Sequence, residues 1–201
     1  MKNFANLVYS LDQTTKTNKK IELLVGFFEN ANNSDKLWCI ALFSGRRPKR
    51  LISTGYLRQW ACEVTDLPTW LLEDTYSVIG DLAETISLLT PEKNQFSEKS
   101  LTAWISELRQ LEKQSIEEKR HFVVNAWATL NKKECFVFNK LITGGFRLGV
   151  SQKLTLRAIS KITDIDEFEL SLRLMGNWHP ETITWNNLII NDERKSDISR
   201  P

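Results

Sequence analysis

The spacing of apolar residues constrains this chain more than any other feature. Apolar side chains recur every three or four residues, and no stretch alternates apolar with polar residues as a half-buried strand would. The clearest stripes consist of Leu101, Trp104, Ile105, Leu108 and Leu111, followed by Phe122, Ala126, Trp127 and Leu130. The pattern predicts an all-α fold, a compact bundle of about ten helices that each bury one face.

The ends of several helices are marked by capping residues. Ser115 with Glu118, and Asp164 with Glu167, place a side-chain acceptor three residues before a carboxylate, which predicts two helix starts. Gly176 follows an apolar stripe where a helix C-cap is expected. Between the helices we expect loops at residues 31–35, 44–53, 64–68, 91–100, 112–116, 143–151 and 176–183.

The chain is long enough for one large domain or two small ones. Of its 201 residues 41% are hydrophobic, and seven Trp and ten Phe can fill a core. After Trp185 the apolar pattern fades into a polar stretch. We therefore expect a helical domain over residues 1–185 and a linker over residues 186–201.

Neither a membrane span nor a secretory signal is expected, because no run of 18 apolar residues occurs and the N-terminus lacks a charged-then-apolar pattern. The three cysteines, Cys39, Cys62 and Cys135, are far apart and lie in apolar segments, as reduced buried thiols do. His121 and His179 are the two histidines, too few to favour a metal site. These features predict a soluble cytoplasmic protein without a bound metal.

The net charge of +2 conceals four blocks of opposite sign. Residues 1–60 hold ten Lys and Arg against four Asp and Glu, and residues 121–163 hold seven against one. The intervening residues 61–120 and the final residues 164–201 are acidic. Such segregation can create one positive face for a phosphate backbone, although ordinary solvated helix faces can produce the same counts.

A glycine-rich segment at residues 143–151 is the strongest candidate for function. It holds three of the eight glycines, directly before a helix expected to begin near Ser151. Glycines let a backbone approach a ligand closely, and a helix N-terminus favours a phosphate, although a glycine turn between helices is often purely structural. It is not a nucleotide-binding P-loop, because no Gly-Lys-Ser/Thr follows. The candidate contacts are Thr143, Gly144, Gly145, Arg147, Gly149, Ser151, Gln152 and Lys153.

A basic loop at residues 45–50 is the second candidate. Its cations are Arg46, Arg47, Lys49 and Arg50. The loop precedes Thr54, near a predicted helix start that offers further backbone donors to phosphate. The alternative is an ordinary solvated loop.

A third candidate begins at Gly80, which interrupts a helical pattern and can contact a ligand through its backbone. Asp81 is interpreted as a structural N-cap, because an acidic cap does not suit phosphate. Asp81 and Glu84 have no partner histidine or lysine nearby in sequence, so catalysis is not expected from them.

Four segments together resemble a known family. They are residues 4–19, the GDLAET stretch at residues 80–85, the TGGFRLGVS stretch at residues 143–151, and residues 174–180. Over essentially the whole chain they resemble the N-terminal DNA-binding region of bacterial ATP-dependent DNA ligases. The resemblance implies an all-helical domain that contacts the minor groove on both sides of a nick. It also implies that the glycine-rich turn lies against the DNA backbone.

One motif of that family is missing. The adenylated lysine of the ligases lies in a Lys-x-Asp-Gly motif, which this sequence lacks. We therefore expect residues 1–201 to be non-catalytic and to hold no cofactor. The resemblance implies that ATP and Mg²⁺ are used by nucleotidyltransferase and OB-fold domains further along the parent chain, with residues 186–201 leading toward them. The expected partner is nicked duplex DNA, bound without preference for base sequence. Binding to a membrane is not expected.

A different class of function remains open at this point. The chain can also be a helical protein-interaction or scaffold module whose basic loops are ordinary surface. If it binds DNA, the cations of residues 46–50 should converge with residues 143–153.

Overall fold

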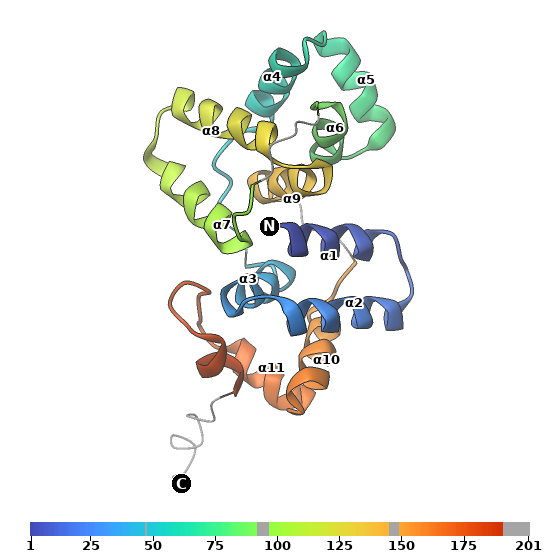
Figure 1. The fold of residues 1–201 in the computed structure, drawn as a ribbon, viewed down its shortest axis with the longest axis vertical. Coiled ribbons are helices and arrows are strands. Elements are labelled where there is room, and N and C mark those ends of the chain that lie inside the picture. The colour runs from blue at the N-terminus through green and yellow to red at the C-terminus, as the bar shows by residue number, and fades with distance from the viewer. Residues whose placement is uncertain (47, 92–96, 145–148, 191–201) are drawn as a thin grey trace. The chain divides into compact units, whose positions relative to one another are not determined.

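The computed structural model describes residues 1–46, 48–91, 97–144 and 149–190. These residues form helices and loops without a strand (Figure 1). The elements are α1 (Lys2–Asp12), α2 (Thr17–Asn30), α3 (Asn33–Phe43), α4 (Thr54–Thr65), α5 (Thr69–Ile79), α6 (Leu82–Leu89), α7 (Leu101–Gln110), the 3₁₀ turn η1 (Leu111–Lys113), α8 (Ile116–Thr129), α9 (Lys132–Thr143), α10 (Gln152–Thr163), α11 (Glu167–Met175) and the π-helical turn η2 (Asn186–Ile190). The predicted all-α fold is confirmed, with eleven α-helices among the described residues.

The helices group into two compact units. The first comprises Met1–Tyr9 and Arg47–Arg147, and the second comprises Ser10–Arg46 and Leu148–Pro201. The chain thus passes between units within α1, within the basic loop and within the glycine-rich segment. Two of the three segments singled out in the sequence contain these boundaries, a division that the apolar pattern did not indicate.

In the first unit α6 lies along α9, and α4 and α5 pack against α6. The stripes of residues 101–111 and 122–130 are buried as predicted, except that Phe122 is only half-buried. The ring of Phe138 on α9 meets Trp104 on α7 edge-on, with ring centroids 5.3 Å apart. Periodic apolar residues therefore fill this core.

A single buried amide joins three helices of the first unit. The indole Nε1 of Trp127 on α8 donates to Oδ1 of Asn139 on α9 at 2.8 Å. The Nδ2 of Asn139 in turn donates to the carbonyl of Ala83 on α6 at 3.3 Å. Asn139 is completely buried, so these bonds satisfy groups that water does not reach.

In the second unit α10 lies along α2 and also packs against α3 and α11 (Figure 1). The core reaches the expected domain end, where Trp185 packs on Phe28 with centroids 6.1 Å apart. Leu188 and Ile189 of η2 are buried as well, so ordered packing extends into the range expected to be a linker. Residues 191–201 lie outside the described residues, and the linker stays a prediction.

One predicted helix start is confirmed and one is wrong. Ser115 and Glu118 form a complete capping box at the start of α8. Asp164 instead ends α10 in the left-handed conformation, with φ of 57°, and Asp166 caps α11 by accepting from the amide of Phe168 at 2.8 Å. Aspartate serves at either end because it tolerates left-handed backbone and also accepts from free amides.

Gly176 follows α11 at its predicted C-cap position, but with extended rather than left-handed backbone. No helix among the described residues is long and apolar enough to cross a membrane.

Candidate nucleic-acid interface

In the first unit the last residue of the basic loop contacts the first residue of the glycine-rich segment. The guanidinium of Arg50 donates to the carbonyl of Thr143, at the end of α9, at 3.3 Å. Lys49 is 86% exposed and lies 3.8 Å from the carboxylate of Glu112. Arg50 therefore contacts Thr143, the first residue of the segment 143–153, whereas convergence of the basic loop with the rest of that segment stays a prediction.

Arg46 lies in the second unit, and its guanidinium forms hydrogen bonds within that unit. It donates to the carbonyls of Trp178 at 2.9 Å, Leu174 at 3.2 Å and Gly176 at 3.0 Å, and it stacks on the Trp178 ring at 4.6 Å. These bonds close the C-terminal end of α11, whose last carbonyls lack helical partners. The structure thus gives Arg46 a structural role, and a phosphate contact from it stays a prediction. Arg47 lies outside the described residues.

Thr54 lies where the sequence placed it, in the first turn of α4. The N-cap is Ser53, whose hydroxyl accepts from the amide of Tyr56 at 3.4 Å. The basic loop thus leads directly into a helix N-terminus, where the partial positive charge of the helix dipole is concentrated.

Gly80 and Asp81 separate α5 from α6. Gly80 has φ of 78°, and a Cβ there would meet nothing within 4 Å, so the backbone conformation rather than space requires glycine. Asp81 caps α6 by accepting from the amide of Glu84 at 3.1 Å, as predicted. Its carboxylate also pairs with the ammonium group of Lys140 on α9.

Lys140 was not identified from the sequence. Its side chain is almost fully buried, and it stands 59 residues from Asp81, so no local pattern signals the pair. The carbonyl of Lys140 also accepts from the amide of Gly144 at 2.9 Å. One lysine thereby joins the Gly80 turn to the start of the glycine-rich segment.

The two described ends of the glycine-rich segment both adopt left-handed backbone. Gly144 ends α9 with φ of 75°, in the first unit, and Gly149 has φ of 58°, in the second. Gly145 and Arg147 lie outside the described residues. Ser151 caps α10 as predicted, accepting from the amide of Leu154 at 3.4 Å.

Gln152 and Lys153, the first two residues of α10, are exposed. In the second unit the ammonium group of Lys20 on α2 donates to the carbonyl of Gly149 at 3.1 Å. Lys20 was also not identified from the sequence, because no local pattern distinguishes it from its neighbour Lys19.

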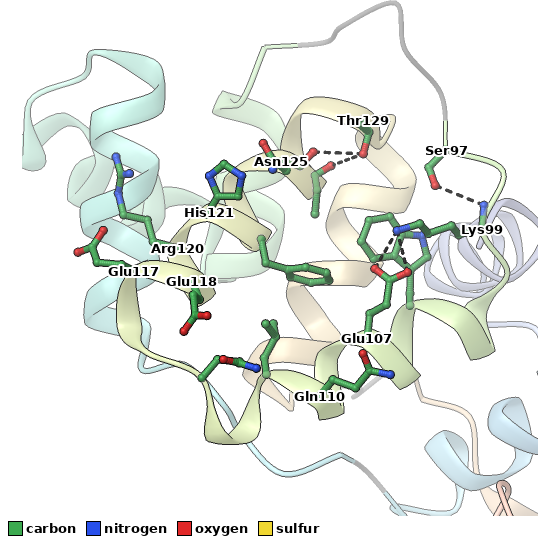
Figure 2. A pocket seen from close by; sticks show the side chains of 15 residues that line it. Ser97, Lys99, Glu107, Gln110, Glu117, Glu118, Arg120, His121, Asn125 and Thr129 are labelled. Carbon is green, nitrogen blue, oxygen red and sulfur yellow. Dashed lines mark hydrogen bonds and ion pairs between the residues drawn. The ribbon is translucent and has the colours of Figure 1, made fainter.

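A broad groove in the first unit has a different character. It is lined by residues of α7, η1 and α8, among them the apolar Trp104, Leu111 and Phe122. Its charged rim, shown in Figure 2, consists of Lys99, Glu107, Glu117, Glu118 and Arg120. The groove holds more acids than bases, which does not suit phosphate.

The two cations of the groove are paired with carboxylates. Lys99 lies 2.7 Å from Glu107, and Arg120 lies 2.8 Å from Glu63 on α4. The bonds from Arg120, with a further one from Gln59, hold the pKa of Glu63 below the ordinary range of a glutamate.

The three thiols are free, and Cys39 and Cys135 are buried while Cys62 is half-buried. Burial raises the pKa of Cys135 to about 11. Among the described residues no three His, Cys, Asp or Glu side chains form a cluster that could hold a metal ion.

Comparison with known families identifies most of the chain. A family model described as DNA ligase N terminus matches residues 1–160, which include α1 to α9, the basic loop, the glycine-rich segment and most of α10. No curated protein matches the chain significantly.

Proposed function

Because the chain belongs to the DNA ligase N-terminus family, the N-terminal domain of ATP-dependent DNA ligases, we propose that it binds nicked duplex DNA. In this role it holds the two sides of the nick in place while other domains join the strands. The contacts are made by the basic loop, the glycine-rich segment and the start of α10.

The hydrogen bond from Arg50 to the carbonyl of Thr143 is the observation that supports the proposal most strongly. It joins Arg50, the neighbour of Lys49 in the basic loop, to Thr143 at the start of the glycine-rich segment within the first unit. A carbonyl carries no net charge, so Arg50 keeps its positive charge at this point of the surface. Cations of this kind bind phosphates and displace counterions from DNA.

The residue types of the interface favour binding without base specificity. Thr143 and Ser151 offer hydroxyls, the glycines offer backbone amides, and the remaining candidates offer charge. Such groups contact phosphate and sugar, whereas base reading requires side chains that enter a groove and match base edges. We therefore expect the domain to recognise backbone shape in the minor groove.

Chemistry is assigned to other parts of the ligase. Because the sequence lacks a Lys-x-Asp-Gly motif, we propose that residues 1–201 form no covalent adenylate. ATP and Mg²⁺ are then bound by nucleotidyltransferase and OB-fold domains of the same parent chain, which are the partners of this domain.

A second function, protein docking, is favoured by α11. Phe168, Leu172 and Met175 stand one and two helical turns apart and are exposed. Exposed apolar stripes of this kind often mark contacts with proteins. This face belongs to residues beyond the matched family region and is compatible with DNA binding elsewhere.

DNA binding is tested with the full chain and three duplexes: one nicked, one intact with the same sequence, and one nicked with an unrelated sequence. We expect tight binding to both nicked duplexes, with equal affinities. Arg147→Ala should weaken binding to each and reduce the magnitude of the salt slope by roughly 1. Absence of binding at low salt, strong discrimination between the two sequences, or covalent uptake of label from radiolabelled ATP would contradict the proposal.

A further inference from the structure

Two adjacent lysines of α2 have opposite environments. Lys19 is 58% exposed and pairs with Glu22 one turn later on the same helix. Lys20 is only 9% exposed, and its ammonium group donates to the carbonyl of Gly149 at 3.1 Å. Burial of a lysine is costly unless a partner compensates for the lost hydration of its charge. The contact with Gly149 therefore requires an explanation.

The peptide of Gly149 is constrained in two ways. Its φ of 58° is left-handed, and a Cβ at this position would lie 3.0 Å from the ammonium nitrogen of Lys20. Gly149 is itself exposed, so water could satisfy its carbonyl if the lysine were absent. The lysine is therefore not needed to satisfy a buried acceptor, and what it adds is a fixed direction for this carbonyl.

A fixed carbonyl also fixes the next amide. In a planar trans peptide the carbonyl of Gly149 and the N–H of Val150 point in opposite directions. Since the carbonyl points toward Lys20, the N–H of Val150 points away from it. This amide stands directly before Ser151, the N-cap of α10, where the helix dipole favours an anion.

We propose that Lys20 is a positioning residue for DNA binding: it holds the Gly149 peptide so that the amide of Val150 is presented to a DNA phosphate. The inference rests on the proposed function of this segment. Lys20 acts through the backbone of Gly149 and does not itself touch the phosphate.

The test compares Lys20→Met with Lys19→Met in the full chain. Both variants remove one charge from α2, and methionine preserves an apolar stem for packing. We expect Lys20→Met to bind nicked duplex about tenfold more weakly, because a hydrogen bond from a charged donor no longer orders the turn. Its salt slope should stay unchanged, since no phosphate-contacting cation is lost. Lys19→Met should change the affinity less than about twofold.

Three results would overturn the inference. A salt slope reduced by about 1 in Lys20→Met means that the lysine contacts phosphate directly. A lower melting temperature with unchanged affinity means that its role is structural. Equal binding by Lys20→Met and the unsubstituted chain removes the inference but leaves the proposed function intact, whereas failure of the unsubstituted chain to bind removes both.

A second variant decides the question if Lys20→Met does not fold. Gly149→Ala disturbs the same peptide, because its Cβ would crowd the Lys20 ammonium group and strain the left-handed backbone, so it should also weaken binding with an unchanged salt slope. Where both single variants fold, the double variant should bind no more weakly than the weaker single variant, because both act on one peptide. Unaltered binding by Gly149→Ala, or additive losses in the double variant, would contradict the inference.

Discussion

The groove between α7 and α8 and the surroundings of the basic loop hold their cations in different ways. In the groove Lys99 and Arg120 face the carboxylates of Glu107 and Glu63. In the loop the guanidinium groups of Arg46 and Arg50 donate to backbone carbonyls. A carboxylate cancels the charge of its partner, whereas a carbonyl orients the cation and leaves its charge. We therefore expect the partners of the cations, more than their number, to decide where a phosphate binds.

The cations of the basic loop differ in how far their charge is free to contact DNA. Arg46 donates to three carbonyls, Arg50 donates to a single carbonyl, and Lys49 is 86% exposed and lies 3.8 Å from the Glu112 carboxylate. The three described cations of the loop thus range from one that stabilises the end of α11 to one that is mostly in solvent. Substitutions along the loop should separate folding from DNA binding.

The largest expected effect comes from reversing charge in the loop. Lys49→Glu combined with Arg50→Glu should weaken binding to nicked duplex about a hundredfold, because two phosphate contacts at about 1.4 kcal/mol each become repulsive. The matched control is Lys99→Glu with Arg120→Glu, which makes the same change of charge at the two cations of the groove. Filter binding at constant salt measures both, and similar losses in the two variants would remove the distinction between the regions.

A smaller effect, on stability, is expected at the structural end of the loop. Arg46→Met leaves the carbonyls of Leu174, Gly176 and Trp178 without their donor, so the free energy of unfolding should fall by about 2 kcal/mol. The DNA affinity of the folded protein and its salt slope should remain unchanged. Urea unfolding together with binding at several salt concentrations checks this, and a reduced slope would restore Arg46 to the DNA contacts.

The smallest effect concerns pH. The folded-state pKa of Glu63 is lowered by Arg120, so their pair contributes stability above the pKa of the unfolded glutamate and loses it as pH falls through the folded pKa. The carbonyl of Thr143 does not titrate. Between about pH 8 and about pH 5 neither contact should change, and below that range only the groove should respond. Carbon-13 NMR of the Glu63 carboxyl and the Thr143 carbonyl measures this, and a Thr143 signal that follows Glu63 would argue against it.

Much of the fold could be predicted because its signals are local. The stripes of residues 101–111 and 122–130 and the capping box at Ser115 depend on residues within a few turns of one another. The misplaced cap at Asp164 arose because aspartate suits both helix ends, and Asp166 lies only two residues away. The division into two units depends on contacts between distant helices, which periodicity does not record.

The candidate site could be predicted only in part for the same reason. Residue types and spacing identified the loop of Lys49 and Arg50 and the helix start at Ser151. The roles of Lys20, Lys140 and Arg46 depend on partners 129, 59 and about 130 residues away in sequence. Nothing in the sequence distinguishes these three cations from one another. Tertiary contacts alone give Lys20 a backbone carbonyl, Lys140 a carboxylate, and Arg46 the carbonyls at the end of α11.

The salt dependence of DNA binding tests the central claim most directly. The affinity for nicked duplex is measured against salt concentration for the unsubstituted chain, Arg50→Gln and Arg120→Gln. The account predicts that Arg50→Gln reduces the magnitude of the slope by about 1, while Arg120→Gln leaves it unchanged because its charge is already balanced by Glu63. An unchanged slope for Arg50→Gln, or an equal reduction in both variants, would contradict the claim that Arg50, whose partner is a carbonyl, contributes its charge to the DNA-binding surface.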